Sequence, residues 1–152
     1  MAPTIYSEKF SMTRVLWTVS LVCLIVTAPS ARAAERISAA VFGRDPTRFT
    51  DHQIRIDKLG CFFSPDAGYR CTTYAGAYVL LGDVAPAGVR AKIKAECGGI
   101  VEGEDDPSCL FDLVFTPSGS SKGVGQIVKG DRAVQGTVWM VKAASATLSL
   151  HR

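Results

Sequence analysis

The sequence lacks the short motifs by which most catalytic and metal sites are recognised. It contains no G-x-S-x-G, H-E-x-x-H or Walker sequence, and its two histidines, His52 and His151, lie far apart along the chain. The cysteines are too widely spaced for a C-x-x-C redox pair or for the short cysteine pairs of zinc sites. These absences argue against an enzyme and against a bound cofactor. A small secreted hydrolase that uses His52 is the weaker alternative, and we expect the penultimate His151 to be frayed.

The sequence also lacks an apolar run long enough to cross a bilayer as a helix, which needs roughly 18 residues. Its longest run, Val15 to Ala28, follows Arg14 and precedes Ala31-Arg32-Ala33, which satisfies the A-x-A cleavage rule. We therefore predict a signal peptide over residues 1–33, with Met12 as an alternative start and an uncleaved anchor as the alternative outcome. The mature protein is expected to be periplasmic or secreted, without a transmembrane span.

An excess of charge of one sign is missing as well. Cleavage after Ala33 lowers Lys plus Arg from 17 to 14 and Asp plus Glu from 14 to 13, so the net charge falls from +3 to +1. A globally basic nucleic-acid binder is therefore not supported. Residues 34–152 contain no repeat and no long linker, and their number suits one domain.

Four cysteines remain after the predicted cleavage, and an even number in an exported chain indicates disulfides. The turn-forming segment 64–68, SPDAG, is flanked by apolar and aromatic residues and predicts a hairpin. Cys61 and Cys71 are equidistant from the centre of that turn, so they would face each other across the two strands. Cys97 and Cys109 then pair by elimination. A metal site and free thiols are the alternatives.

Most of the remaining pattern has the period of two that is typical of half-buried strands. The clearest case is VRAKIKAEC, residues 89–97, in which apolar and charged residues alternate. Further strands are expected at 53–57, 74–84, 110–117 and 133–141, a short helix at 35–43, and a mobile surface loop at 116–125. Five or six strands in a chain of this length predict a small barrel or sandwich.

Residues 37–61, ISAAVFGRDPTRFTDHQIRIDKLGC, resemble the opening of small exported bacterial OB-fold proteins. In that family a short helix and a DP-x-[RK]-[FY] turn lead into a strand of the form x-V-x-V-x-G. The matching positions are Asp45-Pro46, Arg48-Phe49, Ile54, Ile56 and Gly60. The resemblance implies an all-β, OB-like barrel of five strands with a short N-terminal helix. It implies no catalytic residues, because many binding activities share this fold.

Two charged clusters are candidate ligand sites. Arg90, Lys92 and Lys94 would form a basic row on one face of the predicted strand at 89–97, where they could bind a nucleic acid, a glycan or a lipid surface. Plain solvation is the alternative for that row. An acidic cluster within the second disulfide loop is a weak calcium candidate, although its spacing is not that of an EF-hand and a solvated loop is the better interpretation. Its members are Glu102, Glu104, Asp105 and Asp106.

Three tyrosines on or beside the second strand, Tyr69, Tyr74 and Tyr78, could form an aromatic surface, but at least two are expected to cap the core. Taken together, these features predict an exported, non-enzymatic barrel that acts as a binding or envelope accessory module, with no cofactor. An envelope protein or an anionic ligand is the expected kind of partner, and neither ligand nor partner can be named from the sequence. The alternatives are a binder of anionic ligands through the basic row and, more weakly, a calcium-dependent factor or hydrolase.

Overall fold

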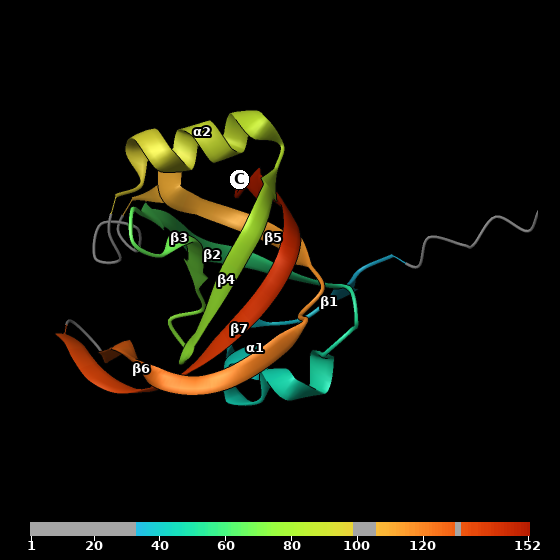
Figure 1. Ribbon diagram of the computed structural model, residues 1–152, viewed down its shortest axis with the longest axis vertical. Helices are drawn as coiled ribbons and strands as arrows, with labels where there is room; N and C mark the ends of the chain where they lie inside the picture. Colours follow the sequence, from blue (N-terminus) through green and yellow to red (C-terminus); the bar gives the residue numbers. More distant parts are fainter. Residues whose placement is uncertain (1–32, 99–105, 130–131) are drawn as a thin grey trace, which may run out of the picture. The chain divides into compact units, whose positions relative to one another are not determined.

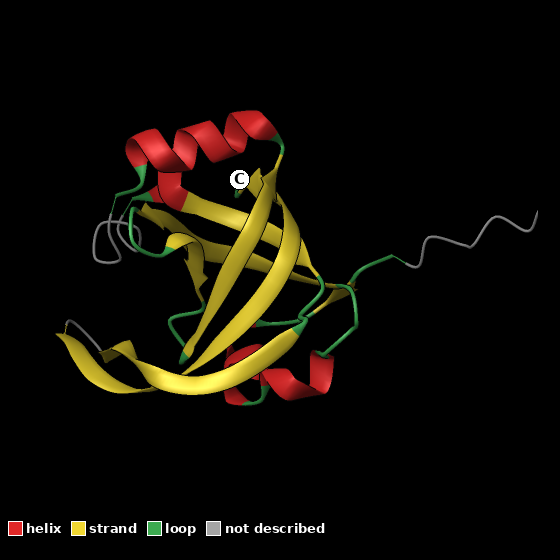
Figure 2. Cartoon of the chain, in the orientation of Figure 1, coloured by secondary structure: helices red, strands yellow, loops and turns green. Residues whose placement is uncertain are grey.

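The computed structural model describes residues 33–98, 106–129 and 132–152 (Figure 1). Strands dominate the described part of the chain, with two short α-helices and two single 3-10 turns between them (Figure 2). The elements in chain order are β1 (Glu35–Arg36), α1 (Ala39–Arg44), η1 (Pro46–Phe49), β2 (Ile54–Ser64), β3 (Gly68–Thr72), β4 (Ala77–Ala85), α2 (Ala87–Glu96), η2 (Pro107–Cys109), β5 (Leu110–Phe115), β6 (Gly119–Lys129) and β7 (Arg132–Leu150).

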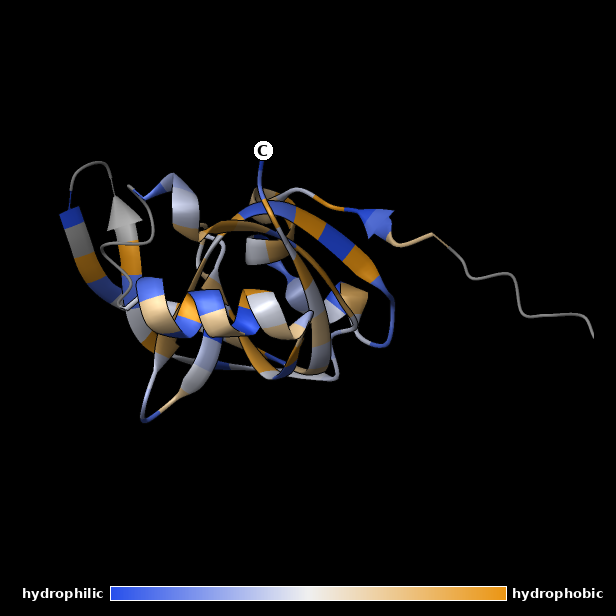
Figure 3. Ribbon diagram, turned by 90° about the horizontal axis from the view of Figure 1, so that it is seen from above, coloured by the Kyte–Doolittle hydropathy of each residue, from blue (hydrophilic) through white to orange (hydrophobic). Residues whose placement is uncertain are grey.

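Five of these strands close into a barrel. Neighbours follow the order β2-β3-β4-β7-β5, and β5 pairs back with β2. Within the barrel β4 and β7 run parallel, and the other neighbouring pairs are antiparallel. Hydrophobic and hydrophilic residues alternate along the barrel strands (Figure 3), because one face of each strand lines the core. The predicted all-β fold, a small barrel stapled by disulfides, is confirmed.

Two disulfides fasten the barrel, and both pairings are as predicted. Cys61 of β2 lies directly opposite Cys71 of β3, and both are buried in the core. Cys97, after α2, is bonded to Cys109, before β5, so this bridge ties the helix to the strand that follows it. A disulfide that closes a loop of this size stabilises a protein by about 3 kcal/mol. Two formed disulfides indicate an oxidising compartment outside the cytoplasm.

The prediction of a strand at residues 89–97 is wrong, because this segment belongs to α2 and the residue after it. Alanine, lysine, arginine and glutamate are all good helix formers, and they dominate the segment. The alternation also contains a helical stripe, since Val89, Ile93 and Cys97 are four residues apart and share one helix face. Ile93 and Cys97 are buried in the main core, and Val89 packs against it. In Figure 1, α2 covers one end of the barrel and α1 the other.

The prediction of a mobile loop at residues 116–125 is also wrong for most of that segment, since β6 begins at Gly119. All eleven residues of β6 pair with β7 in one unbroken antiparallel register, from Gly119 opposite Lys142 to Lys129 opposite Arg132. Because β7 is 19 residues long, its second half completes the barrel while its first half carries β6. The backbone pairing, rather than side-chain hydrophobicity, keeps this glycine-rich segment extended.

The N-terminal helix is shorter than predicted and covers Ala39–Arg44, while Glu35 and Arg36 pair with β2 instead. Ser38 caps the helix by accepting a hydrogen bond from the Val41 N–H at 3.3 Å. Phe42 anchors α1 to the barrel, because its fully buried ring meets that of Phe115 edge-on with centroids 5.6 Å apart. None of the helices in the described residues has the length and apolar character needed to cross a membrane.

Candidate functional site

The three cations predicted to bind ligand lie on α2, and each has a close neighbour. Arg90 Nη1 lies 3.3 Å from an Asp83 carboxylate oxygen, Lys92 pairs with the glutamate one turn later, and Lys94 Nζ lies 5.4 Å from the centre of an aromatic ring on β2. Residues two apart point to nearly opposite sides of a helix, so the continuous basic row expected on a strand does not form. A binding role for these residues stays a prediction.

The predicted acidic site lies mostly outside the described residues, which include Asp106 but not Glu102, Glu104 or Asp105. Asp106 begins the η2 turn, where its carboxylate accepts a hydrogen bond from the Ser108 N–H at 2.8 Å. Hydrogen bonds from the side chain and the backbone of Ser108 lower the pKa of the Asp106 carboxyl. No group of three His, Cys, Asp or Glu side chains within the described ranges is placed to hold a metal ion. Calcium binding stays a prediction.

The two histidines lie in separate parts of the described structure. His52 is exposed in the turn after η1, where its N–H donates to the Phe49 carbonyl at 3.0 Å. The prediction that His151 is frayed is wrong. Its N–H donates to the Leu110 carbonyl at 2.9 Å, and its Nδ1 lies 2.6 Å from an Asp112 carboxylate oxygen. The β5–β7 ladder continues as far as Leu150 and therefore places His151 beside Asp112.

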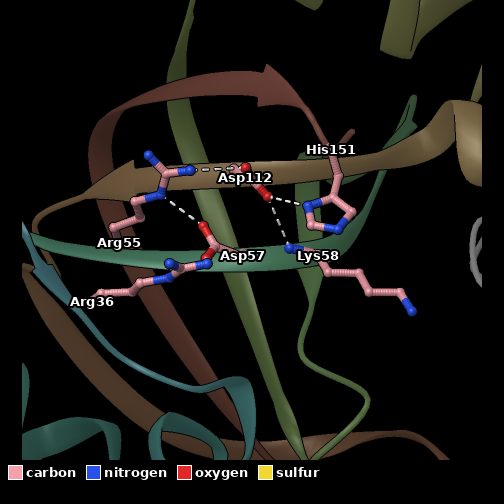
Figure 4. A network of polar contacts seen from close by, with 6 residues as sticks. All are labelled: Arg36, Arg55, Asp57, Lys58, Asp112 and His151. Atoms are coloured by element: carbon pink, nitrogen blue, oxygen red, sulfur yellow. Dashed lines mark hydrogen bonds and ion pairs between the residues drawn. The ribbon is translucent and has the colours of Figure 1, made fainter.

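A polar network surrounds Asp112 on the outer face of β5 (Figure 4). Besides His151, the carboxylate contacts Arg55 Nη2 at 2.9 Å and accepts from the Lys58 N–H at 3.1 Å. The pairing of β2 with β5 shifts register between Ile56 and Leu59, and Lys58 has a φ of 57° at this irregularity. The shift frees the Lys58 N–H from the ladder, while its ammonium points away from the network.

The second carboxylate of the network is Asp57. It accepts from Arg55 Nε at 2.6 Å and pairs with Arg36 of β1. The hydrogen bond from Arg55 lowers the pKa of the Asp57 carboxyl, and the hydrogen bond and charge of Asp57 raise the pKa of Arg55. Both carboxylates are therefore neutralised within the network, which joins β1, β2, β5 and the end of β7. We interpret it as a connection between strands.

A second surface is formed by β6 and residues 132–142 of β7, which we call the arm. The arm packs on the outer face of the barrel, where Val138 and Tyr78 are both buried. The Tyr78 hydroxyl donates to the Gln126 carbonyl of β6 at 2.8 Å, and burial raises the pKa of this phenol. Close packing requires glycine at position 125, since a Cβ there would lie 2.6 Å from a Val138 methyl.

A cleft of about 330 Å³ separates the arm from the rim of the barrel, and we call it the arm cleft. Its lining includes Gly43 of α1, Gly76 before β4, and Lys122, Ile127, Thr137 and Trp139 of the arm. The Lys122 ammonium lies 5.1 Å from the centre of the Trp139 ring. Trp139 Nε1 donates to the Arg44 carbonyl at 3.3 Å, which holds the indole at the junction of arm and barrel. The arm cleft thus brings together an aromatic ring, a cation and a glycine-lined wall.

The three tyrosines do not form one aromatic surface. Tyr69 packs against Phe63 with ring centroids 5.0 Å apart, on the side of the sheet that faces the main core. Tyr78 lies on the opposite side, beneath the arm. The Tyr74 ring covers Gly60, where a Cβ would lie 1.9 Å from the phenol oxygen. Two of the three therefore pack against buried clusters, but on opposite faces of the sheet.

Sequence reasoning missed the arm, although a signal for it exists. Register places Lys129 opposite Arg132, so only Gly130 and Asp131 connect the two strands. A two-residue Gly-Asp connection between extended segments is a recognised hairpin signal. The glycines and serines that precede it, at 116–125, favoured a loop and concealed the strand.

No protein-family model, no curated protein and no solved structure shows significant similarity to this chain. The functional assignment therefore rests on the geometry of its own residues.

Proposed function

We propose that this protein is an exported, non-enzymatic binding module with an OB-type barrel, and that its ligand binds in the arm cleft. The observation that carries the proposal is the position of this cleft beside the arm, with Trp139 and Lys122 in its wall. The sequence supports export through its apolar run before an A-x-A site, and the two disulfides agree with that route. The absence of catalytic motifs from the sequence favours binding over catalysis.

The strand order supports the OB assignment. OB barrels have five strands in Greek-key order, and their ligands bind on the face of the second and third strands and on the loop before the last strand. In this chain β3 and β4 are the second and third barrel strands, and the connection from β5 to the last barrel strand carries β6. The arm thus occupies the position of a ligand-binding loop, next to the expected face.

The test uses the mature protein, residues 34–152, in which Trp139 is the single tryptophan. Its fluorescence is followed during titration with a single-stranded DNA oligonucleotide, a heparin oligosaccharide and a neutral oligosaccharide. We expect a saturable change with at least one of them, because the indole lies in the cleft wall. If none of the three changes the emission, the proposal that the ligand binds in the arm cleft fails.

A pair of matched variants locates the site. Thr137→Phe places a ring in the arm cleft, whereas Thr147→Phe places the same ring at an exposed position of β7 that does not line the cleft. We expect the first variant to lose binding and the second to retain it. Equal ligand binding by the two variants would exclude the arm cleft as the ligand site. Reversing the charges of Arg90, Lys92 and Lys94 tests the surface of α2 in the same assay, and a loss of binding in that variant alone would assign the ligand to the helix.

A further inference from the structure

Arg70 is a cation on the outer face of the barrel that forms no ion pair with any carboxylate among the described residues. It lies in β3 immediately before Cys71, whose side chain is buried in the core, so the arginine side chain points to the outside. Arg70 is only half exposed, and its Nε is shielded from solvent and has no hydrogen-bond partner. None of the ion pairs between described residues includes it.

The surroundings of Arg70 in the sheet contain no acid. Phe62 of β2 and Leu80 of β4 lie directly opposite it on its two sides. The diagonal positions and the nearest same-face positions of β3 are occupied by neutral residues, namely Gly60, Ser64, Gly68, Thr72, Tyr78 and Gly82. Sheet neighbours at these positions are the ones that an arginine side chain can reach most directly. The barrel itself therefore supplies no counter-charge.

The segment that packs over this face adds positive charge rather than negative. The two strands of the arm, residues 119–129 and 132–142, contain four Lys and Arg and no Asp or Glu, whereas residues 34–115 contain nine Lys and Arg and twelve Asp and Glu. The arm contacts the barrel at Tyr78, diagonally next to Arg70, and the positive charge of Arg70 favours ionisation of that phenol. Arg70 and Tyr78 are thus diagonal neighbours on the outer face, beside the arm.

A partly buried charge without a partner is costly, and native proteins pair such charges or use them to bind ligands. A guanidinium presents two parallel N–H groups that match the oxygens of a carboxylate or a phosphate. We propose that Arg70 is the anion-binding residue of this module and that its ligand carries a carboxylate or phosphate group, bound beside the arm. The inference rests on the proposed binding function and adds the chemical class of the ligand. Nε itself is shielded from solvent, so the oxyanion would accept from the outward N–H groups of the same guanidinium and change the environment of the Nε donor.

The experiment observes that donor directly. The Arg70 Nε–H resonance of the ¹⁵N-labelled mature protein is followed during separate titrations with inorganic phosphate and with acetate. We expect a saturable shift with at least one anion, and the anion that binds more tightly identifies the group that the ligand carries. Arg70→Gln should weaken that binding by about ten-fold or more, measured by the rise in melting temperature that the anion produces. Arg70→Lys keeps the positive charge but loses the two parallel N–H donors, so this variant should retain part of the anion binding.

Arg36→Gln is the matched control, because it removes an exposed arginine that already pairs with Asp57 and belongs neither to the arm nor to α2. It should leave the response of Arg70 unchanged. The inference is overturned if neither anion moves the Nε–H resonance, or if Arg70→Gln keeps the full response of the melting temperature. The two proposals can fail separately. If an oligomer changes the Trp139 fluorescence but neither anion shifts the Arg70 Nε–H resonance, this inference alone is overturned. If an anion shifts that resonance but no oligomer changes the fluorescence, the inference is supported and the arm cleft is rejected as the ligand site.

Discussion

Substituting Gly125 with alanine tests whether the arm packs on the barrel as closely as the structure indicates. The added Cβ would lie 2.6 Å from Val138 Cγ2 and 2.9 Å from Tyr78 Cε2. Both neighbours are almost fully buried, with 2% and 3% of their surface exposed, so neither can move away into solvent. The methyl group must therefore displace the arm or strain the two buried side chains.

The size of the effect follows from two opposing contributions. Overpacking of a well-packed cluster destabilises a protein by about 1–3 kcal/mol. Replacing glycine with alanine also restricts the unfolded chain, which stabilises the folded state by about 0.4–1 kcal/mol when the backbone tolerates the change. We expect Gly125→Ala to lower the free energy of unfolding by about 0.5–2 kcal/mol, the difference between these two contributions.

Gly119→Ala is the matched control on the same strand and the same face of the arm. A Cβ at Gly119 meets no atom within 4 Å, so only the effect on the unfolded chain remains. Urea unfolding of the mature proteins, followed by Trp139 fluorescence, gives both free energies. The free energy of unfolding of Gly119→Ala should equal or exceed that of the wild type. If Gly125→Ala proves as stable as Gly119→Ala, then the arm does not pack against Tyr78, and the geometry of the arm cleft must be rejected with it.

Two further predictions concern the helix and the polar network. Ile93→Ala should lower the free energy of unfolding by about 2–5 kcal/mol, since Ile93 is the fully buried anchor of α2; a loss below about 1 kcal/mol in urea unfolding would contradict this packing. Asp57→Asn should make the free energy of unfolding less sensitive to a fall in pH. The Arg55 hydrogen bond lowers the pKa of Asp57 in the folded state, so its contribution is present at neutral pH and is lost as the pH falls through that folded pKa. Urea midpoints between about pH 5 and pH 2 should therefore fall more steeply for the wild type than for the variant, and equal slopes would refute the role of the pair.

Local chemistry was enough to predict the hairpin and its disulfide. The SPDAG turn sets the register of β2 against β3, and that register brings Cys61 opposite Cys71. The pairing of Cys97 with Cys109 followed because no other cysteine remained. These features depend on neighbours within about ten residues, and turn preferences act over that range.

The segment 89–97 shows where local patterns fail. Its apolar residues satisfy a period of two, but Val89, Ile93 and Cys97 also satisfy the spacing of a helix, and the pattern alone cannot choose between them. The helix forms because it covers one end of the barrel and places Ile93 in the core. The candidate cations on this segment were assigned to a common face for the same reason, and the change from strand to helix moves Lys92 to the side opposite Arg90 and Lys94.

The sequence by itself determined the all-β class, the hairpin and the two disulfides, because these depend on composition, on turn chemistry and on a small number of cysteines. The tertiary structure alone decided the arm, the arm cleft and the position of Arg70 among neutral neighbours of the described sheet. Residues 119–129 are held as a strand by backbone hydrogen bonds to β7 rather than by hydrophobic side chains of their own. Likewise, Arg70 is one arginine among several in the sequence. Only the pairing of β3 with β2 and β4 surrounds it with neutral sheet neighbours and leaves its Nε without a hydrogen-bond partner among the described residues.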